Sequence, residues 1–162
     1  MMNTLFLQLG SNLGDREQLI KDAMNLINEK IGKVVSSSKI YESDPWRVDG
    51  QKNYLNQILE VHSSLSAEDS LKVLQDIENE LGRVRLEKWG ERLIDIDIIF
   101  FNNDIIETPE LCIPHKHMHE RNFVLVPMNE IAPNFVHSKY NKTVSELLHA
   151  TKDIEKVFVY EV

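Results

Sequence analysis

Four stretches of the chain have the apolar patterns that are typical of β-strands. In each one, apolar and polar residues alternate, or β-branched and aromatic residues dominate, as expected where side chains point to opposite faces in turn. The predicted strands are Thr4–Leu9, Val34–Tyr41, Tyr54–His62 and Ile94–Phe101.

Two stretches between these strands have apolar residues three and four positions apart, which places those residues on one face of an α-helix. Asp15 and Ser66 are residue types that cap a helix start, and each is followed three positions later by a polar partner. Gly32 and Gly82 are expected to end the two helices. The predicted apolar faces are Ile20, Ala23, Met24, Ile27 and Ile31 in the first helix, and Leu71, Leu74, Ile77 and Leu81 in the second.

The order of these elements, βαββαβ, predicts an α+β protein with a ferredoxin-like arrangement, in which helices lie on one face of an antiparallel sheet. The chain has no internal repeat, low-complexity tract or linker. A single domain spanning residues 1–162 is therefore expected. Between the second and third strands, residues 42–53 contain Pro45 and Gly50 and are expected to form a loop.

The last third of the chain is expected to add smaller elements to this core. Asn102–Asp104 has the composition of a turn, and Ile105–Ile106 would form a short strand after it. The proline-rich residues 107–141 are expected to wrap the core without regular structure. Thr143–His149 is predicted to be a helix, and Glu155–Tyr160 is a candidate for the last strand.

Composition and charge exclude several classes of protein. The chain of 162 residues has 42% hydrophobic and 27% charged residues, as in ordinary globular proteins. A net charge of −8 argues against a nucleic-acid-binding surface, which needs a basic face. The single cysteine, Cys112, forms no intrachain disulfide, and the apolar run Leu5–Leu7 is too short for a signal peptide or a membrane span. We expect a cytoplasmic protein without a membrane partner.

The strand at residues 94–101 carries the first candidate chemistry. Asp95 and Asp97 would share one face of this strand, roughly 6.6 Å apart along it, while isoleucines occupy the other face. Aspartate is a poor strand former, so two in one strong strand indicate a function such as binding divalent cations. The alternative is that both side chains lie on a solvated face of an amphipathic strand.

A basic segment lies directly before this strand. Arg83, Arg85, Lys88 and Arg92 are opposed by two glutamates, so the segment carries a net charge of about +2 within an acidic chain. Arginine binds phosphate oxygens through two parallel hydrogen bonds, and carboxylates bind the accompanying cations. The combination predicts a polyphosphate site, although the arginines alone could belong to a solvated loop.

These residues resemble the signature of the 6-hydroxymethyl-7,8-dihydropterin pyrophosphokinase family. Six groups of residues agree in order and spacing, and they extend from about Thr4 to beyond Phe135. The groups are Gly10-Ser11-Asn12; Tyr54-x-Asn56; Gln75-x-x-Glu78; Gly82-Arg83-x-Arg85; Lys88-x-Gly90-Glu91-Arg92-x-x-Asp95-Ile96-Asp97-Ile98-Ile99; and Pro114-His115 followed by Arg121-x-Phe123.

The resemblance implies transfer of pyrophosphate from ATP to a pterin alcohol in folate biosynthesis, with release of AMP. It implies that Asp95 and Asp97 bind two Mg²⁺ ions and that Arg83 and Arg92 assist the transfer. It implies an ATP site formed by Gln75, Glu78, Arg85, Ile98, His115 and Arg121. It implies a pterin site formed by Ser43, Asp44, Pro45, Trp46, Tyr54, Asn56, Trp89 and Phe123.

Several of these residues have plainer interpretations when the family is left aside. Tyr54 and Phe123 could be core residues, since buried aromatic side chains mainly contribute packing. Gln75 and Glu78 share one helix face and could simply be exposed. Ser43-Asp44 stands where the family commonly has Thr-Pro, which predicts a less rigid loop.

Two rival classes remain open at this stage. An RNA-binding sheet would need aromatic residues on its central strands and a basic surface, whereas these strands carry aspartates. A ligand-sensing regulatory domain could share the fold, since fold alone does not determine function. We expect a monomeric enzyme that acts on small molecules, with ATP as co-substrate and no nucleic-acid partner.

Overall fold

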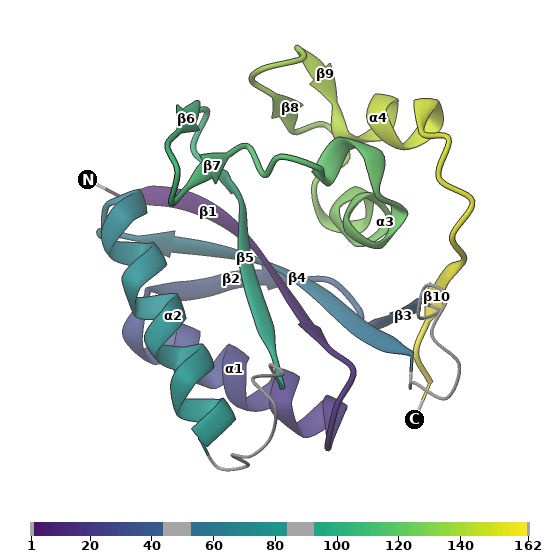
Figure 1. Cartoon of the computed structure of the whole chain (residues 1–162). Helices are drawn as coiled ribbons and strands as arrows, with labels where there is room; N and C mark the ends of the chain where they lie inside the picture. Colours follow the sequence, from purple (N-terminus) through teal and green to yellow (C-terminus); the bar gives the residue numbers. More distant parts are fainter. Residues whose placement is uncertain (1, 44–52, 84–92, 162) are drawn as a thin grey trace.

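The structure is a computed structural model that describes residues 2–43, 53–83 and 93–161 (Figure 1). The predicted α+β class with an antiparallel sheet is confirmed, but the prediction that helices cover one face of the sheet is wrong, because helices lie on both faces. The elements are β1 (Asn3–Ser11), α1 (Arg16–Lys30), β2 (Lys33–Ser37), β3 (Tyr41–Ser43), β4 (Tyr54–Ser63), α2 (Ala67–Arg83), β5 (Asp95–Phe101), β6 (Ile106–Glu107), β7 (Cys112–Ile113), η1 (Met118–Glu120), α3 (Asn122–Ile131), β8 (Val136–His137), β9 (Lys142–Thr143), α4 (Val144–Ala150) and β10 (Val157–Val159).

The main sheet is built around the first strand of the chain. Its strands follow the order β10-β3-β4-β1-β5, and β2 pairs with β4 beside β3. Every pair in the sheet is antiparallel, so β1 lies between β4 on one side and β5 on the other. Residues that are far apart in the sequence thereby become neighbours on the adjacent strands β4, β1 and β5.

Helices α1 and α2 cover one face of this sheet (Figure 1). Leu5, Leu7 and Leu9 of β1 point to this face and are fully buried. They pack against Ile20 and Ile27 of α1 together with residues of α2. The apolar faces predicted for both helices therefore form one side of the core, which stabilises the sheet through removal of apolar surface from water.

Helices α3 and α4 cover only part of the opposite face (Figure 1). The second apolar cluster contains Phe6, Ile58 and Phe100 from the adjacent strands β1, β4 and β5, with Phe135 packed against it. The rings of Phe100 and Phe135 meet edge to face, with centroids 4.6 Å apart. The rest of this sheet face lies beyond the two helices.

On this face the side chains of the three adjacent strands β4, β1 and β5 change from apolar to polar within two neighbouring levels of residue pairs. On β1, Phe6 is followed on the same face by Gln8 and Gly10, and Gln8 pairs with Ile58 on β4 and with Asp97 on β5. Gly10 is paired with Asn56 and Asp95 in the same way. Strand pairing therefore places a polar surface next to the cluster beneath α3.

The second predicted strand, Val34–Tyr41, is wrong as a single element because it is divided into β2 and β3. Between these strands the Ser38 hydroxyl accepts a hydrogen bond from the Ile58 N–H at 3.0 Å, where a continuous ladder would use a backbone carbonyl. The Gln57 side chain donates to the Ser38 carbonyl at 2.7 Å. Side-chain partners thus replace part of the backbone ladder at this point. The loop predicted for residues 42–53 also begins later, since β3 extends to Ser43.

The prediction that residues 107–141 lack regular structure is also wrong, because α3 lies within them. Residues 123–128 are all apolar, so they show no helical period, and Pro127 resembles a helix breaker. Burial against the sheet stabilises the helix nevertheless, and Val124, Leu125 and Met128 are buried there.

The remaining predicted elements agree with the structure to within a few residues. Asp15 caps α1 by accepting from the Gln18 N–H, and Ser66 accepts from the Asp69 N–H before α2. Thr143 caps α4, and β10 lies within the last predicted strand. Gly82 does not end α2, which continues to Arg83. Among the described residues, a Cβ at Gly82 would meet no atom within 4 Å.

No helix in the described part of the chain has both the length and the apolar character needed to cross a bilayer.

His137, which ends β8, makes the stability of the fold depend on pH. The residue is 2% exposed, and its Nδ1 accepts from the backbone N–H groups of Lys139 and Tyr140, each at 3.2 Å. Burial, and then the nearby His119 and Lys139, lower the pKa of His137 from 6.5 to about 4.

Because the unfolded chain binds this proton more readily than the folded protein, the free energy of unfolding should fall as the pH falls from 6.5 towards 4. We expect a loss on the order of 2 kcal/mol from this residue. His137→Asn keeps an acceptor for both N–H groups and does not titrate, so its stability should change less over the same range. Urea unfolding at several pH values measures the free energy of unfolding of both proteins. If this free energy falls equally with pH in both, protonation of His137 is not the cause.

Candidate active site

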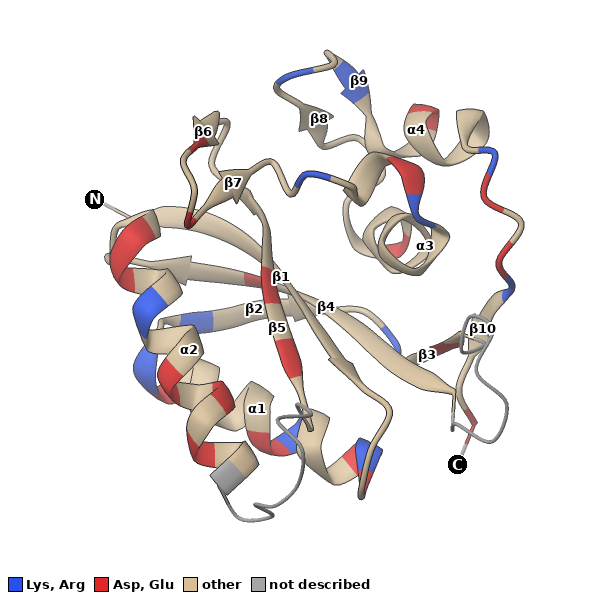
Figure 2. Ribbon diagram, viewed as in Figure 1, with Lys and Arg blue, Asp and Glu red and all other residues tan. Residues whose placement is uncertain are grey.

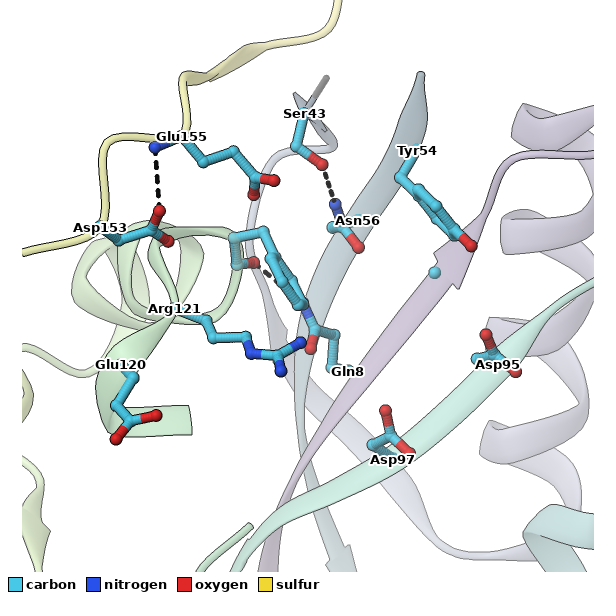
Figure 3. A pocket seen from close by; sticks show the side chains of 12 residues that line it. Gln8, Ser43, Tyr54, Asn56, Asp95, Asp97, Glu120, Arg121, Asp153 and Glu155 are labelled. Atoms are coloured by element: carbon cyan, nitrogen blue, oxygen red, sulfur yellow. Dashed lines mark hydrogen bonds between the residues drawn. The ribbon is translucent and has the colours of Figure 1, made fainter. Parts of the chain in front are cut away.

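The polar part of the sheet face forms one wall of a cavity of about 620 Å³ (Figure 3). The start of α3 and the C-terminal segment before β10 form the other wall. The lining residues are Gln8, Gly10, Ser43, Tyr54, Asn56, Asp95, Asp97, Glu120, Arg121, Phe123, Asp153 and Glu155. The cavity is large enough for a small organic ligand with part of a second one.

Asp95 and Asp97 are neighbours on the pocket face of β5, as the strand pattern predicts (Figure 3). Ile96 between them points into the opposite core and is 5% exposed. The carboxylate of Glu78 on α2 accepts the Ile96 N–H at 2.7 Å. Glu78 thus holds the segment that carries both aspartates, of which Asp95 is half-buried and Asp97 is exposed to the cavity.

The opposite end of the cavity combines aromatic rings with amide groups. Tyr54, 37% exposed at the start of β4, lines the cavity together with Phe123 at the start of α3. Asn56 is 4% exposed and donates a hydrogen bond from Nδ2 to the Ser43 hydroxyl at 3.1 Å. A Cβ at Gly10 would lie 3.1 Å from Asn56 Oδ1, so this position accepts little more than a glycine. Aromatic faces beside a fixed amide suit a flat heterocycle with donors and acceptors on its edge.

An arginine lines the same cavity as the aspartates, and a histidine lies beside their strand. The Arg121 guanidinium lines the cavity and lies 5.7 Å from the centre of the Phe123 ring. The backbone N–H of His115 donates to the Ile99 carbonyl at 2.9 Å, which attaches His115 beside β5. Burial lowers the pKa of His115 despite the opposing charge of Asp97, and His117 and Arg121 add to the lowering. His115 is therefore neutral at pH 7 and can bind a ligand without adding charge.

The described cavity walls are predominantly acidic. Five lining residues are carboxylates, and among the lining residues Arg121 is the single arginine or lysine. Figure 2 shows acidic positions on β5 and on the C-terminal segment before β10. An anionic ligand would be repelled by these walls unless cations accompany it.

The structure brings together part of the predicted site. Seven predicted residues line the cavity: Ser43, Tyr54, Asn56, Asp95, Asp97, Arg121 and Phe123. Gln75 is exposed on α2, Glu78 bonds to Ile96, Ile98 is buried in the core, and His115 adjoins β5 outside the lining set. Asp44, Pro45, Trp46, Arg85, Trp89 and Arg92 lie outside the described residues, and Arg83 is described only as the last residue of α2.

Five lining residues were not assigned to the site by the sequence analysis: Gln8, Gly10, Glu120, Asp153 and Glu155, although Gly10 belongs to the family signature. For Gln8 a signal existed, because it is a polar residue within an otherwise apolar strand. Asp153 and Glu155 carried no signal, since their approach to the start of α3 depends on tertiary structure. Asp153 accepts the Asn122 N–H at 2.8 Å, 31 residues away along the chain.

The Glu78 contact generates a prediction about the stability of β5. Replacing Glu78 with Ala removes a charged acceptor from a backbone N–H, so the free energy of unfolding should fall by about 2 kcal/mol. Glu80→Ala on the same helix is the matched control. Glu80 is exposed and pairs with Lys30 at 3.1 Å, and its loss should cost less than about 1 kcal/mol. If denaturant unfolding shows the same loss of unfolding free energy for Glu78→Ala and Glu80→Ala, the contact between Glu78 and Ile96 contributes little to stability.

Comparison with known proteins agrees with this geometry. The family model described as 7,8-dihydro-6-hydroxymethylpterin-pyrophosphokinase (HPPK) matches residues 6–133. The 2-amino-4-hydroxy-6-hydroxymethyldihydropteridine pyrophosphokinase of Bacillus subtilis is 44% identical over 132 residues, which are 81% of this chain and 79% of the relative. The enzyme of the same name from Aquifex aeolicus is 38% identical over 145 residues, which are 90% of each chain.

Solved structures show the same fold at lower identity. A crystal structure of wild-type Plasmodium falciparum HPPK-DHPS superposes with a TM-score of 0.74 at 17% identity and covers 92% of this chain. The chain spans 44% of the length of that solved protein. On the family match and the closely related sequences, the chain belongs to the 7,8-dihydro-6-hydroxymethylpterin-pyrophosphokinase family.

Proposed function

We propose that this chain transfers the pyrophosphoryl group of ATP to 6-hydroxymethyl-7,8-dihydropterin in the cavity described above, with release of AMP, as a step of folate biosynthesis. The observation that carries the proposal is that one cavity has two different linings. Asp95 and Asp97 line it from β5, which we call the acidic end, and Tyr54, Asn56 and Phe123 line it from β4 and the start of α3, which we call the aromatic end. A triphosphate and a flat heterocycle bound at these ends would meet between them.

The residues at the acidic end fit a pair of Mg²⁺ ions. Mg²⁺ in nucleotide enzymes is usually held by one or two carboxylates, with water and phosphate oxygens as the other ligands. Asp95 and Asp97 supply two such carboxylates on one strand face. Within the described ranges no group of three or more His, Cys, Asp or Glu side chains is placed to hold a metal. This agrees with ions whose coordination the nucleotide completes. Bound Mg²⁺ would neutralise phosphate charge and polarise the transferring group.

The nucleotide would lie between β5 and the start of α3. We assign ATP binding to the family positions Gln75, Glu78, Arg85, Ile98, His115 and Arg121. The position of Arg121 in the cavity and of His115 beside β5 supports this assignment. The Ile98 side chain is 4% exposed, so any contact from this residue would be made by its backbone.

The pterin would lie at the aromatic end. We assign its ring to the space between Tyr54 and Phe123 and its polar edge to Asn56. The burial of the Asn56 amide and its bond to Ser43 support a fixed orientation, which favours one arrangement of donors and acceptors on the ligand. Ser43, Asp44, Pro45, Trp46 and Trp89 complete this proposed site.

The chain would accelerate transfer mainly by positioning and by charge stabilisation. The hydroxymethyl oxygen of the pterin attacks the β-phosphorus of ATP and loses its proton to water, the bond from that phosphorus to the bridging oxygen of the α-phosphate breaks, and AMP leaves. We assign to Arg83 and Arg92 the stabilisation of charge on the transferring group. No side chain is assigned as an obligatory base.

We also propose a finer description of the fold. The chain order β1-α1-β2/β3-β4-α2-β5, with β1 between β4 and β5, supports a ferredoxin-like core in which β2 and β3 together act as one strand. The central place of β1 and the pairing of β10 with β3 support a single domain over residues 1–162. The monomeric state and the cytoplasmic location stay predictions.

Product analysis tests the proposed reaction. With ATP, Mg²⁺ and 6-hydroxymethyl-7,8-dihydropterin, the protein should form AMP and the pterin diphosphate without ADP. Asp97→Asn removes one carboxylate charge from the proposed Mg²⁺ site and should lower turnover by at least about 100-fold while the fold is retained.

Asp104→Asn is the matched control, because Asp104 is an exposed aspartate in the turn after the same strand. It should keep the wild-type rate. Absence of AMP with the wild-type protein would exclude the reaction and favour a ligand-sensing domain. Full activity of Asp97→Asn would exclude the proposed metal site.

A further inference from the structure

Pro127 leaves one backbone carbonyl of helix α3 without its usual helical partner. In a regular α-helix the carbonyl of residue 123 accepts the N–H of residue 127. Residue 127 is a proline and has no N–H to donate. The carbonyl of Phe123, whose ring lines the cavity, therefore needs a partner from outside the helix.

Gln8 supplies that partner from the central strand. Its side-chain Nε2 donates to the Phe123 carbonyl at 2.8 Å, across 115 positions of the sequence. Gln8 is 4% exposed and points from β1 into the cavity, between Arg121 and Asp97 (Figure 3). A buried amide that donates to an otherwise unpaired carbonyl stabilises the structure more than an exposed amide does, because water can replace neither buried group as a partner.

The start of α3 is held by side chains that are distant from it in the sequence. Arg121, which precedes the helix, makes no capping hydrogen bond with its side chain. The first N–H of the helix, from Asn122, is accepted instead by Asp153 of the C-terminal segment at 2.8 Å. The segment that carries Arg121 and Phe123 is thus held by three hydrogen bonds from Asn122 to Asp153 and Glu155 of the C-terminal segment and by one from Gln8 of β1.

We propose that Gln8 is a positioning residue that fixes the Phe123 ring over the pterin end of the cavity through the Phe123 carbonyl. The inference rests on the proposed function and adds to it a residue that acts on the pterin end of the cavity and not on the nucleotide end. Gln8 pairs with Asp97 in the sheet, so the same residue relates the ring to the strand that carries the proposed metal site. Its loss should loosen the pterin end and leave the nucleotide end intact.

Gln8→Met tests the role, since methionine keeps the length and volume of the side chain and lacks the donor. The KM for the pterin should rise roughly tenfold, while kcat and the KM for ATP change less than about threefold. Gln57→Met is the matched control. Gln57 is also a buried glutamine of a central strand, but it donates to Ser38 and does not line the cavity. It should lower stability without raising the pterin KM.

Pro127→Ala provides the decisive comparison, because alanine restores an N–H that can reach the Phe123 carbonyl within the helix. In this background Gln8→Met should change the pterin KM by less than about twofold, so the two substitutions are not additive. If Gln8→Met alone does not fold, a double variant that folds with a near-normal pterin KM still supports the proposal.

Three results would overturn the proposal. They are a normal pterin KM for Gln8→Met, the same rise with and without Pro127→Ala, and failure of both Gln8→Met variants to fold. Failure of the proposed function is a separate result, since the wild-type protein would then form no AMP at all.

Discussion

The antiparallel pairing of β1 with β4 and β5 is the constraint on which the cavity depends. On one sheet face it brings together the positions at which β1, β4 and β5 change from apolar to polar side chains, and on all three strands the apolar residues have ended at the level of Gly10. Ile58, Phe6 and Ile99 lie beneath α3, whereas Asn56, Gly10 and Asp95 lie beyond it. A shift of one residue in either pairing would turn the polar side chains towards α1 and α2 and the apolar ones towards the cavity. Core and site are therefore specified by the same register.

The elements that were predictable from the sequence are those stabilised by local patterns. The caps of α1 and α2, the apolar faces of these helices and the alternation in β5 all depend on residues within a few positions of one another. The same holds for Asp95 and Asp97, because a strand period of two places both on one face without knowledge of any neighbour. The family resemblance added Tyr54, Asn56, Arg121 and Phe123, which spacing alone could not distinguish from ordinary packing residues.

The features that were missed depend on partners distant in the sequence. Helix α3 has no apolar period and contains Pro127, and its start is held by Asp153 and Gln8 rather than by a local cap. The interruption between β2 and β3 depends on Ser38 meeting Ile58 and Gln57 of β4. In each case a side chain replaces a backbone partner, and no rule based on neighbouring residues indicates which distant side chain is available.

The pairing of β10 with β3 has a consequence for the order in which the protein is completed during synthesis. Val157–Val159 lie more than 100 positions after Tyr41–Ser43, and Asp153, which holds the first turn of α3, lies just before them. A chain still attached to the ribosome can assemble β1, β4, β5 and both covering helices before these residues emerge from the exit tunnel. The outer wall of the cavity is then the last part to form, so a nascent chain would acquire its fold before it acquires a complete binding site.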